Sequence, residues 1–296
     1  MRKIVIKKSP HTSCKIVAFV FLFCISALSL GFFLLIHPYR SLVPTLMYHA
    51  ILDTKEQVRR SDMPAITLDL FKQQMDYIER HGYEPVSLLT VIEMRKEGKP
   101  IPSHWVVLTF DHALKTFYDN AWPVLKTHRF KATLFVSPRF VGSDENHLNW
   151  AQLEETHQSG LVEVGSHSLY HALLPCLPKE EAKKRMRQSK FEIEEHLKTP
   201  VKLFAYPFGS LNLEVKKLVQ ETGYEGAVGT VYPRGNFPIR DIFNLRRMNV
   251  YEFSKNPFVF RYMLSGYYVP TVGLFLKMAN IQTPRAAERC GDYFLS

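Results

Sequence analysis

Two hydrophobic patterns alternate along the chain between residue 45 and about residue 252. Short apolar, β-branched runs predict buried strands over residues 45–49, 105–111, 131–136, 162–167, 201–206, 227–229 and 245–250. Stripes of apolar residues at helical spacing predict helices between them, over residues 67–80, 88–97, 112–128, 150–160, 178–198 and 211–222. This alternation of strand and helix predicts an α/β fold with a parallel sheet, either open or closed into a barrel.

Capping and breaking residues mark the ends of several predicted helices. Thr67 and Asn149 precede helical stretches and can accept N–H groups of the first turn, while Gly82 and Gly160 follow the last periodic residues. Pro123 lies inside the pattern over residues 112–128 and predicts a kink or two short helices. Residues 51–66 are polar and are predicted to form a loop.

An apolar N-terminal segment precedes the alternating region. Residues 1–15 are basic, and residues 16–36 carry no charged side chain. A helix of about 20 residues spans the roughly 30 Å hydrocarbon core of a bilayer, and no A-x-A-like cleavage site follows this one. These features predict a single-pass anchor in the cytoplasmic membrane, with the domain on the extracytoplasmic side. The alternative, a long signal peptide that is cleaved, also exports the domain.

The overall charge narrows the choice of partners. Of the 296 residues, 46% are hydrophobic, which is enough for a large core, and the formal net charge is +10. Such a charge suits nucleic acid, an anionic membrane surface or an acidic polymer. The sequence has no zinc finger and no RNA-binding aromatic signature, so no nucleic-acid partner is expected.

The four cysteines do not form a metal-binding pattern. None of them belongs to a Cys-x-x-Cys pair, so a thiolate zinc site is not expected. Cys14 and Cys24 lie in or beside the apolar N-terminal segment. Cys176 and Cys290 are able to pair in an oxidising compartment, but we expect two unpaired thiols.

Residues 256–296 form an aromatic and basic C-terminal tail. Side chains of this kind either pack on the preceding domain or touch a membrane surface. We expect packing on the domain.

Ionisable side chains follow two of the predicted strands. The strand over residues 105–111 ends in Asp111 and is followed by His112, and the strand over residues 162–167 ends in His167, with His171 four residues later. Because α/β folds gather their chemistry at the C-terminal ends of strands, these four side chains are predicted to share one site. For any single histidine, a hydrogen-bonded loop position is the simpler explanation.

Three neutral imidazoles with one open coordination position make a catalytic, zinc-like centre. Such a centre lowers the pKa of bound water to roughly 7. With His112, His167 and His171 as ligands, Asp111 is placed to take a proton from that water. The pattern predicts a divalent metal, with zinc as the first candidate, and metal-assisted hydrolysis of a bond that these residues do not specify.

Several ordered motifs resemble those of polysaccharide deacetylases, the NodB-like domain of carbohydrate esterase family 4. They are Thr109-Phe110-Asp111, His167-Ser168-Leu169-Tyr170-His171 and Tyr206-Pro207-Phe208-Gly209. Met47-Tyr48-His49, Phe204-Ala205-Tyr206-Pro207 and Leu245-Arg246-Arg247-Met248 are similar to the branch that deacetylates exopolysaccharides such as poly-N-acetylglucosamine. The resemblance covers about residues 43–255, which we predict to be one deacetylase-like domain.

The resemblance implies a distorted (β/α) barrel with fewer than eight complete units. It implies that Asp111 is the catalytic base and that His167 and His171 are metal ligands. The peptide N–H of Phe208, next to Pro207, would help to stabilise the oxyanion of the tetrahedral intermediate.

Three more residues are implied around the sugar. Tyr206, Trp150 and Arg247 would shape the sugar site or orient the base. Core packing explains the two aromatic side chains equally well, and a structural ion pair explains Arg247 equally well.

Two departures from the family pattern bear on the site. The family's second Asp, a metal ligand, is His112 here, and since imidazole is a good zinc ligand we predict that metal binding is retained. The alternative is that the imidazole does not reach the metal. No histidine follows His196, so the late histidine that serves many members as general acid is absent. His49 is the candidate acid by position, with a buried, hydrogen-bonded histidine as the alternative.

Three functions are compatible with this sequence. The first is a membrane-anchored, metal-dependent N-deacetylase of an N-acetylated cell-surface polysaccharide. The second is a catalytically weak or inactive relative that binds glycan or assists an export complex. The third is a hydrolase of the same fold that acts on another acyl or amide bond.

Overall fold

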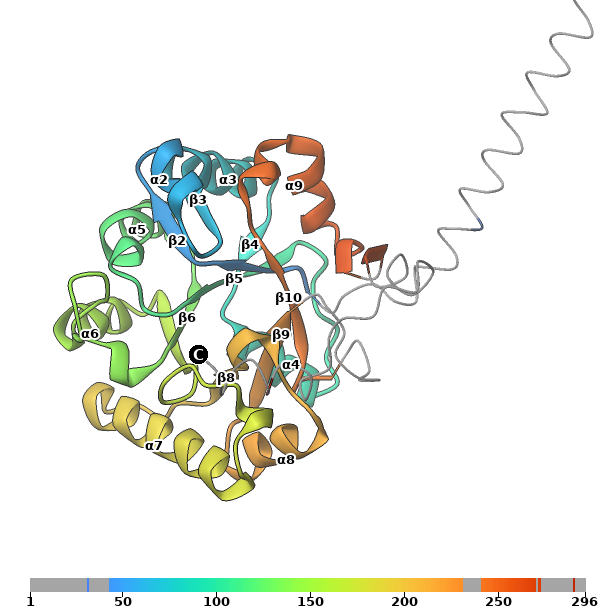
Figure 1. The fold of residues 1–296 in the computed structure, drawn as a ribbon. Helices are drawn as coiled ribbons and strands as arrows, with labels where there is room; N and C mark the ends of the chain where they lie inside the picture. Colours follow the sequence, from blue (N-terminus) through green and yellow to red (C-terminus); the bar gives the residue numbers. More distant parts are fainter. Residues whose placement is uncertain (1–30, 32–42, 231–240, 270, 273–289, 291–296) are drawn as a thin grey trace, which may run out of the picture. The chain divides into compact units, whose positions relative to one another are not determined.

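Seven parallel strands close into a barrel in the computed structural model (Figure 1). They are β1 (Thr45–Tyr48), β5 (Trp105–Asp111), β6 (Ala132–Val136), β7 (Val162–Ser166), β8 (Leu203–Ala205), β9 (Gly226–Thr230) and β10 (Leu245–Asn249). Their order is β1-β10-β9-β8-β7-β6-β5, and β1 pairs with β5 to complete the ring. The predicted α/β barrel of fewer than eight units is confirmed.

The described part of the chain comprises residues 43–230, 241–269, 271 and 272, with residues 31 and 290 described singly. The chain divides into two units, residues 1–40 and residues 41–296, and the barrel belongs to the second. The predicted anchor over residues 16–36 therefore lies outside the described residues, apart from Gly31. Within the described residues, none of the helices has the length and apolar character needed to cross a bilayer.

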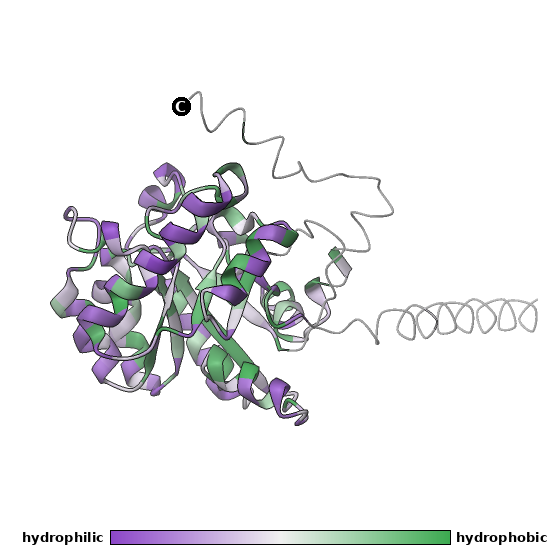
Figure 2. Ribbon diagram, turned by 90° about the horizontal axis from the view of Figure 1, so that it is seen from below, coloured by the Kyte–Doolittle hydropathy of each residue, from purple (hydrophilic) through white to green (hydrophobic). Residues whose placement is uncertain are grey.

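Helices surround the barrel, and all but α4 lie along its outside. They are α2 (Lys55–Arg60), α3 (Leu68–Arg80), α4 (Leu88–Lys96), α5 (Trp122–His128), α6 (Trp150–Gln158), α7 (Lys179–Leu197), α8 (Leu213–Glu221) and α9 (Pro257–Leu264). In Figure 2 the strands are largely green, whereas polar purple residues lie along the outer helices. The main core therefore lies between the barrel and the surrounding helices.

The amphipathic α3 illustrates how the sequence specifies a covering helix. The Thr67 side chain accepts the Leu70 N–H at 3.2 Å and starts the helix. Phe71, Met75 and Ile78 follow at helical spacing and are fully buried against the barrel. Asn149 caps α6 in the same way by accepting the Gln152 N–H, so both predicted caps are confirmed.

A second core fills the barrel interior near the starts of the strands. Val91 and Ile92 of α4 pack there against inward-facing residues such as Val107 and Leu245. Strand β5 also pairs at its beginning with β4 (Glu84–Pro85), before its later residues pair with β1. Helix α4 and β4 thus close this end of the barrel and leave the other end for chemistry.

Two local predictions differ from the structure or are refined by it. Residues 51–66, predicted to be loop, contribute to β2 (Ala50–Leu52), α2 and β3 (Ala65–Thr67), and β2 and β3 pair as a small separate sheet. Their polar residues belong to the exposed α2, while Ile51 and Ile66 are buried. The region around Pro123 divides, as predicted, into a π-helical turn η2 (Phe117–Ala121) and α5.

The prediction of unpaired thiols at Cys176 and Cys290 was wrong. The two residues form a disulfide, with their Cα atoms 5.2 Å apart and a sequence separation of 114. Sequence separation carries no information on this proximity, because the pairing depends on how the C-terminal part of the chain returns to the barrel. Cys176 ends the 3-10 helix η4 (Leu174–Cys176), which follows His171 by only a few residues.

The described part of the C-terminal tail packs on the domain, as expected. Helix α9 buries Phe260, Met263 and Leu264 in the main core and leaves Phe258 and Tyr262 exposed. The rest of the predicted tail, beyond residue 272, lies outside the described residues except for Cys290.

Candidate active site with a three-histidine cluster

Three imidazoles meet at the barrel end where the strands finish. His112 follows β5 directly, His167 follows β7 directly, and His171 lies in the loop after β7. One ring nitrogen from each lies within 4.8 Å of the other two, and the ring centroids of His112 and His171 are 4.5 Å apart. The structure therefore brings together the three residues that the sequence predicted to share a metal site.

A backbone contact orients the most buried of these histidines. His167 Nδ1 lies 2.9 Å from the carbonyl oxygen of Ala205 at the end of β8. Because a carbonyl only accepts hydrogen bonds, Nδ1 carries the proton and Nε2 keeps its lone pair. Nε2 then faces the cluster, which is the arrangement that a metal-binding histidine requires.

Burial keeps the three imidazoles neutral at physiological pH. It lowers the pKa of His167 to about 3 and that of His171 to about 2, although the charge of Asp111 acts in the opposite direction. Burial also lowers the pKa of His112. Neutral imidazoles present lone pairs to a cation, so the donor set fits a divalent metal such as zinc.

Asp111 ends β5 and forms a buried, bidentate ion pair with Arg247 from β10. Its Oδ1 accepts from Nη1 at 2.6 Å and its Oδ2 from Nη2 at 2.8 Å. Burial alone would raise the pKa of Asp111, but Arg247 and then His167 hold it well below the usual range. Asp111 is therefore ionised at neutral pH and held beside the histidine cluster, with Oδ2 3.8 Å from His167 Nε2.

Arg247 is itself fixed by the surrounding strands. Its Nε donates to the Gly229 carbonyl at 3.2 Å, and its Nη1 donates to Thr109 Oγ1 at 3.2 Å. Thr109 Oγ1 in turn donates to the Leu46 carbonyl at 2.8 Å. The guanidinium also lies over the Phe135 ring, 5.2 Å from its centroid. Arg247 thus orients Asp111 and also forms a structural ion pair with it, so its geometry fits both of the roles considered for it.

Left-handed backbone conformations gather at this end of the barrel. Five non-glycine residues with positive φ lie there: His112 (76°), Ala113 (54°), Ser168 (65°), His171 (55°) and Phe208 (57°). Residues with a Cβ atom rarely adopt this conformation, and each residue held in it costs the fold about 1–3 kcal/mol. They persist only where the surrounding fold holds them, so the loops that carry two of the three histidines are fixed by the packing around them.

His49 lies next to the cluster. It follows β1, and its ring centroid is 5.5 Å from that of His112. Burial lowers its pKa to about 4, partly offset by the charge of Asp111. Its Nδ1 is buried without a hydrogen-bond partner among the described residues. The alternative considered for His49, a hydrogen-bonded structural histidine, is therefore not observed at Nδ1, and His49 borders the site.

The Tyr206-Pro207-Phe208 motif divides between core and site. Tyr206 is fully buried and donates from its hydroxyl to the Phe243 carbonyl at 2.8 Å, so its side chain belongs to the core. Pro207 opens the 3-10 helix η5 (Pro207–Gly209), in which Phe208 is half-exposed. The Phe208 ring lies 4.3 Å from that of His171, which puts this residue at the edge of the cluster.

Trp150 contacts none of these groups in the described structure. It opens α6 and stacks on His196 of α7, with the ring centroids 3.7 Å apart and 11° between the planes. It also packs against the main core. This geometry therefore favours core packing over a place in the sugar site for Trp150.

Sequence reasoning missed polar residues beyond Arg247 at the end of β10. Asn249 Oδ1 and Glu252 Oε2 are buried and have no hydrogen-bond partner among the described residues. The signal for Asn249 was available, because inward-facing positions alternate along a strand and Asn249 follows Arg247 by two. Glu252 carries no comparable signal, because it lies beyond the strand.

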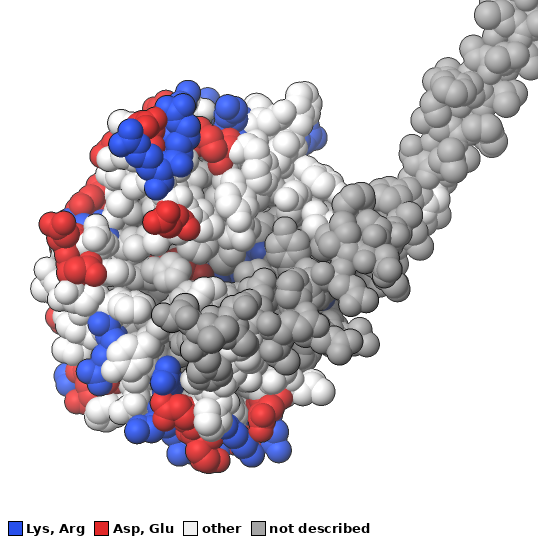
Figure 3. Space-filling model, in the orientation of Figure 1, with Lys and Arg blue, Asp and Glu red and all other residues white. Residues whose placement is uncertain are grey.

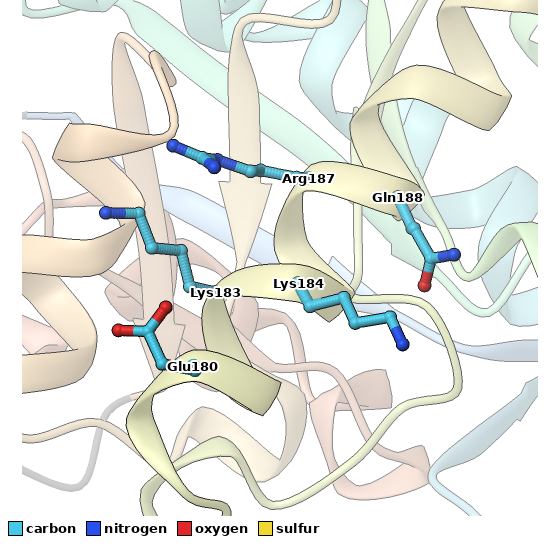
Figure 4. A pocket seen from close by; sticks show the side chains of 5 residues that line it. All are labelled: Glu180, Lys183, Lys184, Arg187 and Gln188. Carbon is cyan, nitrogen blue, oxygen red and sulfur yellow. The ribbon is translucent and has the colours of Figure 1, made fainter.

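Most of the charged side chains visible in Figure 3 lie toward the edge of the face, along the outer helices, and the described residues between them are mostly white. A pocket of about 250 Å³ on α7 is lined by Glu180, Lys183, Lys184, Arg187 and Gln188 (Figure 4). None of the predicted site residues lines this pocket, so it is separate from the histidine cluster.

Comparisons with known proteins agree with this geometry. Residues 98–227 match the family model for polysaccharide deacetylases, a span that contains Asp111 and all three histidines of the cluster but not His49 or Arg247. The Bacillus subtilis protein YxkH is 28% identical over 188 residues, and the chain spans 64% of that relative's length. The poly-beta-1,6-N-acetyl-D-glucosamine N-deacetylase of Staphylococcus epidermidis is 26% identical over 237 residues, which cover 76% of this chain and 79% of the relative.

Solved structures share the barrel. The Streptococcus pyogenes deacetylase PplD, in complex with acetate, aligns with a TM-score of 0.67 and 25% identity, covering 75% of this chain and 97% of that one. IcaB from Ammonifex degensii aligns with a TM-score of 0.64 and 25% identity, covering 76% and 97%. The similarity thus extends over nearly the whole of both neighbours.

Proposed function

We propose that this chain, a member of the polysaccharide deacetylase family, is a metal-dependent N-deacetylase of an N-acetylated cell-surface polysaccharide. The observation that carries the proposal is the contact between the three-histidine cluster and the buried Asp111–Arg247 pair at the open end of the barrel. A family match by itself would leave the chemistry open, because one fold serves many functions. The site supplies a metal-binding donor set and an ionised carboxylate, which are the groups that amide hydrolysis needs.

His112, His167 and His171 would hold one divalent metal, for which zinc is the first candidate. When bound, such a metal polarises the carbonyl group and makes water a better nucleophile at neutral pH. Asp111 takes the proton from the attacking water, and Arg247 keeps the carboxylate ionised and correctly oriented. The peptide N–H of Phe208 donates to the oxygen that becomes negative in the tetrahedral intermediate.

The leaving amine needs a proton, and His49 is the residue we propose for this step. Burial lowers its pKa to about 4, so it is neutral at rest; it would take over the proton that Asp111 removes from water and pass it to the amine. It borders His112 and has one buried nitrogen without a partner among the described residues. No histidine follows His196 in the sequence, so the late histidine that acts as general acid in many family members has no counterpart here. His49 thus completes the proposed set of groups.

We propose poly-β-1,6-N-acetylglucosamine or a closely similar glycan as the substrate. The name of the S. epidermidis relative supports this choice. Hydrolysis of its acetamido groups would convert a neutral polymer into a cationic one.

We propose an extracytoplasmic location, with the chain anchored through residues 16–36. Residues 1–42 include six Lys or Arg and no Asp or Glu, which is the charge distribution expected beside a membrane anchor. The disulfide between Cys176 and Cys290 supports the same side of the membrane, because disulfides persist in oxidising compartments. A polymer outside the cell would be within reach of a domain held there.

The replacement of the family's aspartate by His112 supports a second candidate, a glycan-binding relative without hydrolytic activity. The two functions are separated by purifying the full-length chain, measuring its metal content and assaying acetate release from N-acetylglucosamine oligomers. We expect about one metal per chain and acetate release that depends on it. A protein that binds no metal and releases no acetate, even with added zinc or cobalt, would leave only the second function.

A further inference from the structure

Tyr170, Arg139 and Arg185 form a cluster beside the histidine site, here called the rim cluster. Tyr170 immediately precedes His171 in the loop that follows β7. The guanidinium carbon of Arg139 lies 5.9 Å from the centroid of the Tyr170 ring, and that of Arg185 lies 5.8 Å from it. Both guanidinium groups therefore border one ring, which is one residue away from a proposed metal ligand.

The rim cluster is open to solvent. Tyr170 is 48% exposed, and the side chains of Arg139 and Arg185 are 45% and 24% exposed. Because both guanidinium groups lie within about 6 Å of the same exposed ring, a molecule that contacts Tyr170 is within reach of both of them. The three side chains thus line one accessible surface next to the site.

The charges on this surface are balanced. Arg139 Nη2 donates to Glu192 Oε1 and Arg185 Nε donates to Glu181 Oε1, both at 2.7 Å. A guanidinium has five N–H donors, so most of these donors have no partner among the described residues. Two arginines and two glutamates give no net charge but offer both donors and acceptors. This combination suits a neutral molecule with many hydroxyl groups better than it suits an ion.

Buried hydrogen bonds join the three segments that carry the rim cluster. The first arginine belongs to the 3-10 helix η3 (Pro138–Phe140), and Ser137 Oγ, just before it, donates to the His167 carbonyl at 2.9 Å. Ser166 Oγ lies 2.7 Å from Ser189 Oγ, which joins the end of β7 to α7. Segments that are already held in place lose less conformational entropy when a ligand binds.

We propose that the rim cluster is a subsite for a neutral, N-acetylated sugar unit next to the unit whose acetamido group is hydrolysed. The inference rests on the proposed function, which supplies a polymer with such a neighbouring unit. The exposed part of the Tyr170 ring packs against apolar C–H groups of the pyranose, and Arg139 and Arg185 donate to its hydroxyl and acetamide oxygens. Because these contacts are the same before and during the reaction, the subsite acts on KM.

The test compares a pentamer of β-1,6-linked N-acetylglucosamine with the methyl glycoside of the monomer, which has no neighbouring unit, using the full-length protein. Arg139→Ala should lower the ratio of the two kcat/KM values for acetate release about fivefold, through a higher KM for the pentamer. Tyr170→Ala should act in the same direction. Arg80→Ala, which removes an exposed guanidinium paired with Asp76 on α3, is the matched control and should leave the ratio unchanged.

Binding measurements separate failure of the subsite from failure of the proposed function. Calorimetry with the pentamer should show binding that Arg139→Ala weakens about fivefold, whether or not the protein hydrolyses anything. If the protein releases no acetate but shows this weakening, the subsite stands and the proposed function falls. If the enzyme is active and Arg139→Ala and Tyr170→Ala leave pentamer binding and KM unchanged, the subsite is overturned. Equal losses on both substrates with a lower metal content would also overturn it, because they indicate a structural role only.

Discussion

The two ends of the barrel interior use the same strands for opposite purposes. Near the strand starts, Val107 of β5 and Leu245 of β10 pack with α4 in a closed apolar core. Only a few residues later the same two strands place Asp111 and Arg247 in a buried ion pair beside the three histidines. The closed end stabilises the barrel, and the open end holds charged and strained groups in position. This division is the one expected for (β/α) barrels.

Each end of the barrel has one residue that does not fit this division. At the closed end, Glu163 of β7 is an acid that accepts from the Leu89 N–H and the Thr133 hydroxyl, both at 3.3 Å. At the open end, the Phe135 ring belongs to the apolar core and also supports Arg247. The two ends are therefore distinct in chemistry but joined by one aromatic ring, and variants at each end test how independent they are.

The largest difference should appear when one carboxylate at each end is changed to its amide. Asp111→Asn should reduce acetate release on the order of 10³-fold, because the proposed general base is lost, while metal stays bound. It should also lower the free energy of unfolding by about 3 kcal/mol, since Arg247 keeps its charge without an anionic partner. Glu163→Gln is the matched control and should leave acetate release unchanged. Equal losses in both variants would mean that the open end is not the catalytic end.

Metal removal should affect the open end alone. Chelation is expected to abolish acetate release and added zinc to restore it, while circular dichroism shows an intact barrel, because the closed core contains no ligand.

His112→Asp restores the family's carboxylate and should preserve or raise activity. His112→Ala is the control and should weaken metal binding. Complete inactivity of His112→Asp with metal bound would show that the imidazole itself is required.

A position in β7 at the level of Asp111 tests how the packing around Phe135 affects the site. A Cβ atom on Gly165 of β7 would lie 2.5 Å from the Phe135 ring, so Gly165→Ala should cost about 1–3 kcal/mol. Because Phe135 supports Arg247, we also expect a several-fold fall in kcat. Gly226→Ala meets the movable end of Ile92 and serves as control, with a smaller loss of stability and normal kcat. Denaturant unfolding and acetate release measure both effects.

Much of this division was predictable from sequence, because each strand's pattern reports its own burial. The β-branched runs gave the strand positions, and the polar residues that end β5 and β7 gave Asp111 and the three histidines. The family motifs added Arg247, although neither motif nor spacing distinguishes an orienting arginine from a structural one. Its bidentate contact with Asp111 became evident only in three dimensions.

What sequence could not supply depends on contacts between distant segments. Trp150 is aromatic, as sugar-binding residues often are, and only the packing of α6 beside α7 reveals its stacking on His196. The disulfide between Cys176 and Cys290 likewise depends on where the chain returns after 114 residues. The short strands β2 and β3 were missed because three-residue strands are too brief to show a period.

The smallest expected effect on acetate release concerns the acid at the closed end. Burial raises the pKa of Glu163 from 4.5 to about 7, so the folded protein keeps a proton that the unfolded chain releases. The free energy of unfolding should therefore fall as the pH rises from about 4.5 to about 7, by about 3 kcal/mol at most. Glu163→Gln cannot ionise, yet its amide oxygen still accepts from Leu89. Denaturant unfolding should show that the free energy of unfolding of this variant, relative to that of the wild type, is higher at pH 8 than at pH 5. An equal difference at both pH values would mean that the carboxylate is stabilised by nearby charge such as that of Lys202, and that the closed end tolerates ionisation after all.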